Sequence, residues 1–254
     1  MERDDRAPVA TFYADGALDE GTTVELPDSV AHHARVKRLQ PGDPVRLTNG
    51  AGTLADATLD TIAKSSCIAT IARTEAVSPP RSIHLRVPIA DRERMLWLAE
   101  KTTELGLSSW QAVRWTRSMS VSPRGEGDAF RAKLRARMIS ALEQSGGAWL
   151  PKLLDDTEPN AIDLPSDALP LVLDVNGGGI AGLGALLAMT VAFGPEGGFT
   201  PEELAGLRNN GWRPTALAAT TLRFETAGIA AVACLRAKSL ASANGLKDQI
   251  VRED

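Results

Sequence analysis

Residues 193–204 read FGPEGGFTPEEL, a glycine loop that follows a short apolar run and leads directly into a predicted helix. Thr200 is the expected N-cap, Pro201 fits the first helical position, and Glu203 completes a capping box. Glycines allow backbone groups to approach a ligand closely, and a helix N-terminus favours a carboxylate or a phosphate. The segment therefore predicts a ligand-binding loop, with a plain strand-to-helix turn as the alternative.

Strands and helices alternate on both sides of this loop. Short apolar runs predict buried strands, and apolar residues spaced by three or four predict helices, the first of which Gly106 is placed to end. This alternation predicts an α/β domain over residues 81–254. The predicted strands cover residues 83–89, 169–175 and 190–193, and the predicted helices cover residues 91–105, 128–144 and 224–240.

The first part of the chain has a different pattern. Residues 9–77 alternate short β-rich runs with turn signals, which predicts a small barrel and assigns residues 1–77 to an N-terminal domain. Asn49-Gly50 between two of the runs is a strong hairpin signal, because both positions tolerate positive φ. Residues 77–81 read VSPPR, where two prolines stiffen the backbone and indicate a linker.

The 254-residue chain has a net charge of −4, but its basic residues are clustered. Residues 31–46 hold four basic residues against one acidic residue, and residues 114–137 hold seven against two. Such segregation favours local contact with phosphates, with solvated helix faces as the alternative.

Several classes of protein are not expected. The first ten residues lack the apolar core of a signal peptide, and apolar stretches such as residues 180–189 are too short to span a bilayer. Two cysteines and three histidines without close spacing predict no metal site and no disulfide. We expect a cytoplasmic protein that does not bind membranes.

Residues 222–227 read LRFETA at the predicted start of the last helix. Arg223 and Glu225 are two residues apart, and side chains at this spacing do not share a helix face. We therefore expect Arg223 and Glu225 to have separate roles. A structural ion pair between them at the helix start is the alternative.

A second glycine-rich stretch, LVLDVNGGGIAG over residues 171–182, contains G-x-G-x-x-G after a predicted strand. This pattern is typical of dinucleotide binding, and an NAD-dependent oxidoreductase built on the Gly177 loop is one alternative function. Only 85 residues follow Leu169, however, and at about 30 residues per βαβ unit they cannot supply the strands that such folds place after the motif.

Taken together, the glycine loop, LRFETA and Glu143-Gln144-Ser145 resemble the signatures of the bacterial 16S ribosomal RNA uridine-N3 methyltransferases, the RsmE family of the SPOUT superfamily. Residues 100–106 and Arg117-Ser118 match as well, and residues 32–43 with Asn49-Gly50 are similar to that family's PUA-like RNA-binding barrel. The chain departs from the family near Thr11 and at Gly146-Gly147, where the family usually has arginines, and at Ala218 and Thr220, where it commonly has glycine and arginine.

The resemblance implies a C-terminal trefoil-knotted SPOUT methyltransferase domain at residues 81–254 and an N-terminal PUA-like β-barrel at residues 1–77. It also implies a homodimer that uses S-adenosylmethionine to methylate N3 of a uridine in 16S ribosomal RNA of the small subunit. The residues implied to bind the cofactor are Leu173, Phe193, Gly194, Pro195, Glu196, Gly197, Gly198, Leu217, Thr221, Leu222 and Arg223.

The expected catalytic residues are Arg223 and Glu225. Arg223 would stabilise negative charge on the uracil carbonyls, and Glu225 would orient Arg223 or accept the N3 proton. Besides the oxidoreductase, a non-catalytic RNA-binding protein is an alternative function. The expected RNA contacts are Arg35, Arg38, Arg114 and Arg117.

Overall fold

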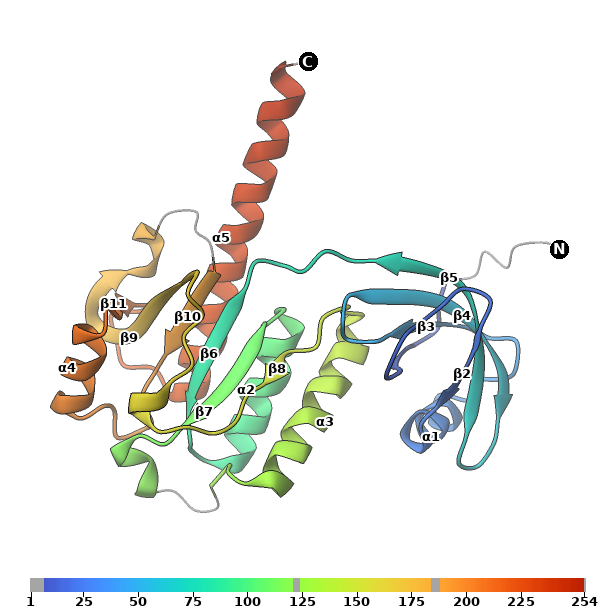
Figure 1. The fold of residues 1–254 in the computed structure, drawn as a ribbon, viewed down its shortest axis with the longest axis horizontal. Helices are drawn as coiled ribbons and strands as arrows, with labels where there is room; N and C mark the ends of the chain where they lie inside the picture. The colour runs from blue at the N-terminus through green and yellow to red at the C-terminus, as the bar shows by residue number, and fades with distance from the viewer. Residues whose placement is uncertain (1–6, 121–123, 184–187, 254) are drawn as a thin grey trace. The chain divides into compact units, whose positions relative to one another are not determined.

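The computed structural model describes residues 7–120, 124–183 and 188–253, which divide into two compact units (Figure 1). Unit 1 contains the residues up to Pro79 together with Ile139–Leu150. Unit 2 contains Pro80–Met138 and the residues from Pro151 onward. One helix, α3 (Asp128–Ser145), therefore contributes residues to both units.

Unit 1 is built on a five-stranded sheet in the order β1-β3-β4-β5-β2. β1 and β3 are parallel and the other pairs are antiparallel. Phe12, Leu47, Leu59 and Ile71 are fully buried in its core. All five strands fall within residues 9–77, where short β-rich runs were expected. They are β1 (Thr11–Tyr13), β2 (Thr23–Leu26), β3 (Pro44–Thr48), β4 (Thr53–Ile62) and β5 (Cys67–Ala76).

The predicted hairpin joins β3 to β4. Asn49 Oδ1 accepts hydrogen bonds from the N–H groups of Ala51 and Thr53, and Gly50 has a φ of +66°. The Trp149 ring packs against the hairpin loop at Gly52. A Cβ on Gly52 would lie only 2.3 Å from this ring, so glycine is required there. This packing explains why Ile139–Leu150 belongs to unit 1 although it lies far along the chain.

One helix of unit 1, α1 (Asp28–Val36), was not predicted, because it is short and buries only small and medium side chains. It ends in a Schellman motif: Leu39 N–H donates to Ala34 O, and Arg38 N–H donates to Arg35 O. Arg38 occupies the left-handed position of this motif with a φ of +58°, where glycine is usual. It is the only described non-glycine residue with positive φ.

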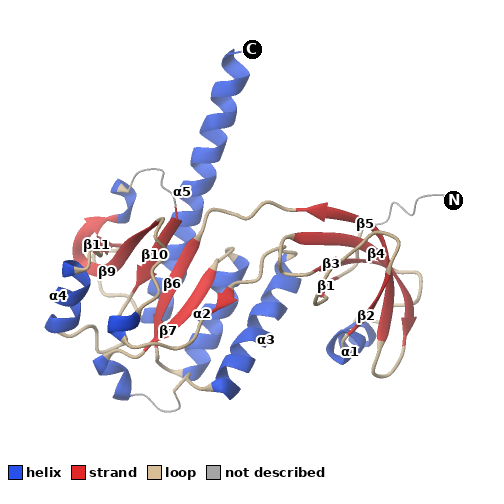
Figure 2. Ribbon diagram, viewed as in Figure 1, coloured by secondary structure: helices blue, strands red, loops and turns tan. Residues whose placement is uncertain are grey.

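Unit 2 contains a six-stranded, entirely parallel sheet in the order β11-β9-β10-β6-β7-β8 (Figure 2). The strands are β6 (Ile83–Pro88), β7 (Ser109–Val113), β8 (Lys152–Leu153), β9 (Ala168–Gly179), β10 (Ala188–Ala192) and β11 (Arg213–Ala216).

Helices cover both faces of this sheet. α2 (Arg92–Glu104) and α5 (Phe224–Glu253) pack together on one face, where Gly228 meets Leu98 and Phe193. α4 (Pro201–Asn209) covers the other face, and its Leu207 packs with Val172 and Ala192. Short 3₁₀ turns occupy Thr116–Ser120, Pro159–Ala161 and Ile180–Gly182.

The pairing of β9 with β11 is interrupted by a five-residue excursion. Val172 pairs with Pro214, but the next β11 residue, Thr215, pairs with Gly178. Residues 173–177 therefore leave the ladder and rejoin it. A Cβ on Gly177 would lie 2.4 Å from Thr215 N, so only glycine fits this approach of two backbones.

The predicted combination of an N-terminal β-sheet unit with a C-terminal α/β unit is confirmed, while the knot stays a prediction. Gly177–Gly179 lie in β9 and precede only a three-residue 3₁₀ turn, so no helix N-terminus is available there for a pyrophosphate. No helix of the described residues is both long and apolar enough to cross a membrane.

The approach at Gly177 yields a direct prediction. Gly177→Ala should destabilise the protein by about 1–3 kcal/mol, because the added methyl group forces the β9 and β11 backbones apart. Gly178→Ala is the matched control, since a Cβ there meets nothing within 4 Å. Urea unfolding of both variants measures the difference, and equal stabilities would contradict the close approach.

Candidate functional site

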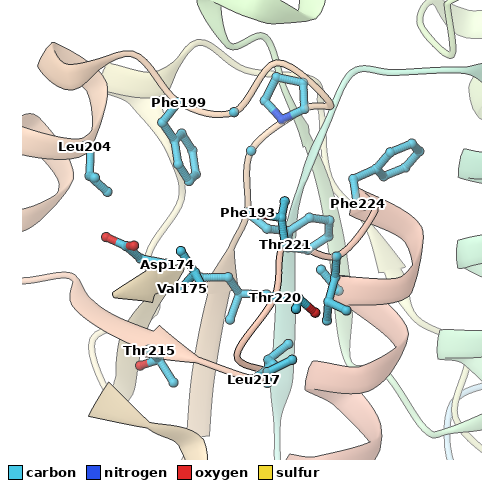
Figure 3. A pocket seen from close by; sticks show the side chains of 17 residues that line it. Asp174, Val175, Phe193, Phe199, Leu204, Thr215, Leu217, Thr220, Thr221 and Phe224 are labelled. Atoms are coloured by element: carbon cyan, nitrogen blue, oxygen red, sulfur yellow. The ribbon is translucent and has the colours of Figure 1, made fainter. Parts of the chain in front are cut away.

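A pocket of unit 2, about 270 Å³ in volume, lies where three neighbouring parallel strands end (Figure 3). The β9 excursion, the loop after β10 and the segment between β11 and α5 form its walls, and this carboxyl edge is where open α/β sheets bind ligands. The lining residues are Leu173, Asp174, Val175, Phe193, Gly194, Pro195, Gly198, Phe199, Leu204, Thr215, Leu217, Ala218, Thr220, Thr221, Leu222, Phe224 and Ala227.

The glycine loop, residues 194–198, is tightly folded. Gly198 N–H donates to Pro195 O at 2.8 Å, and Gly198 has a φ of +68°. A Cβ on Gly194 would lie 3.1 Å from backbone atoms of Gly198 and Phe199. The loop thus brings backbone to the pocket wall where side chains would not fit.

The predicted capping box after the loop is confirmed. Thr200 Oγ1 accepts a hydrogen bond from Glu203 N–H at 3.2 Å, and Glu203 Oε2 accepts one from Thr200 N–H at 2.8 Å. Pro201 occupies the first turn of α4, as predicted. These local bonds fix the direction in which the chain leaves the loop.

Asp174 is the only ionisable side chain among the residues that line the pocket. Its Oδ2 accepts a hydrogen bond from Arg208 Nη2 at 2.8 Å, and its Oδ1 accepts one from Asn176 N–H at 2.9 Å. Figure 3 shows Phe199 and Leu204 on one side of the pocket and Thr221 and Phe224 on the other. A carboxylate in an otherwise neutral, largely apolar wall favours a neutral or cationic ligand over a pyrophosphate.

Eight of the eleven residues predicted to bind a cofactor line this pocket. The other three lie outside its lining: Glu196 pairs with Arg94, Gly197 packs against Arg117, and Arg223 is exposed immediately before α5. Asp174 was missed as a lining residue. Its position at the end of a predicted strand was the available signal.

Glu225 lies in the first turn of α5 and is only 6% exposed. Its Oε2 is buried without a hydrogen-bond partner among the described residues, and the side chain does not line the pocket. Arg223 and Glu225 thus occupy different environments, which agrees with separate tasks for the two side chains.

The basic residues singled out from the sequence differ in their surroundings. Arg35 and Arg38 are exposed at the C-terminal end of α1. Arg114 pairs with Glu158 and Glu126, whose hydrogen bonds raise the pKa of its guanidinium. The second basic segment is therefore less available than its charge count suggests. Ion pairs there also engage Arg124, Arg131 and Arg137.

A metal centre has no support in the part of the chain that the structure describes, where no three His, Cys, Asp or Glu side chains are grouped to hold an ion. Cys67 is buried and Cys234 is exposed, and neither forms a disulfide.

The chain matches two known family models, and both describe RNA methyltransferases. A family model described as an RNA methyltransferase domain matches residues 77–236, and one described as an RNA methyltransferase PUA domain matches residues 26–72. The Ribosomal RNA small subunit methyltransferase E of Mycobacterium tuberculosis is 27% identical over 240 residues, which cover 87% of this chain and 88% of that protein.

Two solved structures extend the likeness to a bound ligand. The Ribosomal RNA small subunit methyltransferase E of Neisseria gonorrhoeae, bound to S-adenosyl methionine, superposes with a TM-score of 0.82 and 29% identity over 90% of this chain and 97% of that one. A Legionella pneumophila protein in complex with the bound cofactor SAM gives a TM-score of 0.82 and 26% identity over 91% and 98%.

Proposed function

The chain belongs to the RNA methyltransferase family, and from this premise we propose that it transfers a methyl group from S-adenosylmethionine to N3 of a uridine in 16S ribosomal RNA. The observation that carries the proposal is the pocket at the three strand ends, which the family's glycine loop lines. A cytoplasmic enzyme acting on the small ribosomal subunit follows from this substrate.

The residues present fit S-adenosylmethionine. The flat ring faces of its adenine suit the walls around Phe193 and Phe199. Its sulfonium and ammonium groups suit a pocket whose only ionisable lining residue is Asp174. Backbone groups of Gly194 and Gly198 would hold the polar edges of the ligand. When bound, S-adenosylmethionine supplies an electrophilic methyl group.

Arg223 is the proposed catalytic residue. Loss of the N3 proton leaves negative charge on the uracil carbonyls, and a guanidinium beside them would stabilise that charge. Arg223 suits this role because it is exposed beside Leu222, which lines the pocket. Glu225, buried two residues later at the start of α5, is proposed to orient Arg223, and its alternative role as acceptor of the N3 proton stays a prediction.

N3 lies on the Watson–Crick edge, so the target uridine must be unpaired when it reacts. Arg35, Arg38 and Arg114 are the proposed RNA contacts. Arg117, the fourth residue expected to contact RNA, donates instead to Gly197 O and Phe199 O of the glycine loop and is not proposed as one. Arg38 has particular support, since a non-glycine residue in the left-handed region is strained. Strain that is retained at an exposed arginine indicates that its side chain is needed there.

A homodimer is part of the proposal. α2 and α5 pack together, yet Trp97 on α2 is 47% exposed and Leu240 on α5 is 60% exposed. Figure 1 also shows the C-terminal part of α5 continuing beyond the sheet of its unit. A second copy would cover such apolar surface.

Cofactor identity is tested by calorimetry. S-adenosylhomocysteine should bind and NAD should not, because a pyrophosphate would meet Asp174 and no cation in the pocket. Gly197→Val should abolish binding, since a Cβ at this position already lies 3.2 Å from Arg117 Cβ and a larger side chain must displace the loop. NAD binding, or unchanged affinity in this variant, would contradict the assignment.

The catalytic role of Arg223 is tested by single-turnover methylation of small subunits. Arg223→Ala should reduce the rate about 100-fold or more, comparable to removing an oxyanion donor, while S-adenosylhomocysteine affinity changes little. Arg223→Lys should recover part of the rate, because it keeps a cation. Equal losses of rate and melting temperature would instead indicate a structural residue. Mapping the nucleotide that loses methylation on gene deletion identifies the substrate.

The strain at Arg38 predicts opposite effects on stability and binding. Arg38→Gly should stabilise the protein by roughly 0.5–1 kcal/mol, because glycine adopts this conformation without a Cβ clash. The same change should weaken RNA binding and reduce the salt dependence by about one phosphate contact. Arg38→Lys, which keeps charge and strain, serves as the control. RNA affinity unaltered by Arg38→Gly would remove this contact.

Sedimentation equilibrium tests the homodimer. The wild type should sediment at twice the 26.9 kDa chain mass at micromolar concentration. Trp97→Glu should shift it toward the single chain, because a charge would be buried in the interface. A wild type that stays at 26.9 kDa would rule the dimer out.

A further inference from the structure

Glu196 and Gly197 of the glycine loop do not line the pocket, and we call this part of the loop its outer face. A side chain from the second basic segment contacts it. Arg117 lies in the 3₁₀ turn Thr116–Ser120, and its Nη1 donates to Gly197 O at 2.7 Å and to Phe199 O at 3.1 Å. These carbonyls follow Pro195, and Phe199 itself lines the pocket. A single guanidinium therefore spans the end of the loop.

Side-chain packing reinforces these two hydrogen bonds. A Cβ on Gly197 would lie 3.2 Å from Arg117 Cβ and 3.3 Å from its Cδ, so the aliphatic part of the arginine covers the bare glycine. Trp115, immediately before the turn, meets the Phe199 ring edge to face at 4.8 Å between centroids. The turn and the loop thus contact each other over several successive residues.

The same turn is also fastened to the helix that follows the loop. Thr116 N–H donates to Glu203 Oε1 at 2.7 Å, while the other oxygen of Glu203 closes the capping box on Thr200. Earlier in the loop, Glu196 pairs with Arg94 of α2. That pair is partly exposed, and so are the hydrogen bonds of Arg117, but Arg117 makes two hydrogen bonds to loop carbonyls and its stem also packs on Gly197. Arg117 therefore makes the more extensive contact with the loop.

A glycine-rich loop needs an external restraint. Glycines lose more conformational freedom than other residues when they become ordered, and a ligand that must order the loop binds more weakly. If other residues already hold the loop in its binding conformation, the ligand does not lose this conformational entropy when it binds.

We propose that Arg117 is a positioning residue for the methyl donor: it holds the glycine loop in its binding shape from the outer face. This proposal rests on the proposed function. Arg117 then contributes to cofactor affinity, although its position in the basic segment 114–137 predicts an RNA contact. RNA affinity is then carried by other cations.

Arg117→Gln separates the two roles. The Kd for S-adenosylhomocysteine and the KM for S-adenosylmethionine should rise about tenfold. This is the effect expected when the ligand must order a loop that has lost two hydrogen bonds. The kcat at saturating cofactor and the Kd for purified small ribosomal subunits should stay within about twofold, because Arg117 touches neither reacting group nor RNA in this role. Arg117→Lys should recover part of the affinity, since its stem still covers Gly197.

The matched control is Arg213→Gln, an exposed arginine of unit 2 with no side-chain bond to the described residues. It should change neither constant. Cofactor affinity unaltered in Arg117→Gln overturns the proposal, and weakened subunit binding at unaltered cofactor affinity would make Arg117 an RNA contact. A global loss of melting temperature in both Arg117 variants would reduce the role to folding. Failure of the wild type to bind S-adenosylhomocysteine would instead overturn the proposed function.

Discussion

The approach of β11 to β9 at Gly177 is the constraint on which the pocket depends. β11 pairs with β9 at Val172 and again at Gly178, so the intervening residues cannot remain in the ladder and form a wall instead. The pairing resumes only because Gly177 has no Cβ to meet Thr215 N. Beneath this wall, Val172 packs with Ala192 of the next strand. The pocket is thus built on a rigid base, although its walls are irregular.

Charge is arranged differently on the two sides of the glycine loop. Inside, Asp174 is the only ionisable lining residue, and Arg208 neutralises part of its charge from outside the pocket. Outside, Arg94 and Arg117 contact the loop. This arrangement leaves the pocket suited to a cationic methyl donor, while the cations contribute to the shape of the loop. The net charge of the chain reveals neither the carboxylate in the pocket nor the arginines outside it, since both depend on which way each side chain points.

In unit 1 a well-formed helix end carries a residue that is poorly suited to it. The Schellman hydrogen bonds of Leu39 and Arg38 are both present, so the left-handed conformation is determined by the end of α1 and not by the arginine. A glycine would lower the strain but remove the charge. The conflict between local preference and observed residue is what one expects at a functional surface.

Arg86 on β6 is a charged side chain that is fully buried in unit 2. Its Nε donates to the Asp163 carbonyl at 2.8 Å, and burial lowers its pKa to about 10, although the charge of Asp163 opposes that shift. Gln111 accepts a hydrogen bond from Asp163 N–H at 3.1 Å. Both polar groups of the Asp163 backbone are therefore satisfied by side chains of the sheet. This arrangement fixes the segment before β9 at the face that α4 also covers.

What the sequence determined by itself is mostly local. The capping box of Thr200 and Glu203, the hairpin at Asn49 and the helix stop at Gly106 each depend on residues within a few positions of one another. For the same reason the longer strands and helices were predictable, whereas α1 and the short strands β7, β8 and β11 were not. Most of the pocket-lining residues were also predictable, because they lie in short motifs at strand ends.

The tertiary structure alone decided which way those motif residues face. Glu196 and Gly197 belong to the loop motif yet lie outside the pocket lining, because Arg94 and Arg117 engage the outer face of the loop. Glu225 is buried although its neighbours gave no sign of it. The bond from Arg117 to Gly197 joins residues 80 positions apart. Contacts of this range arise only when the sheet brings distant turns together, and no local pattern encodes them.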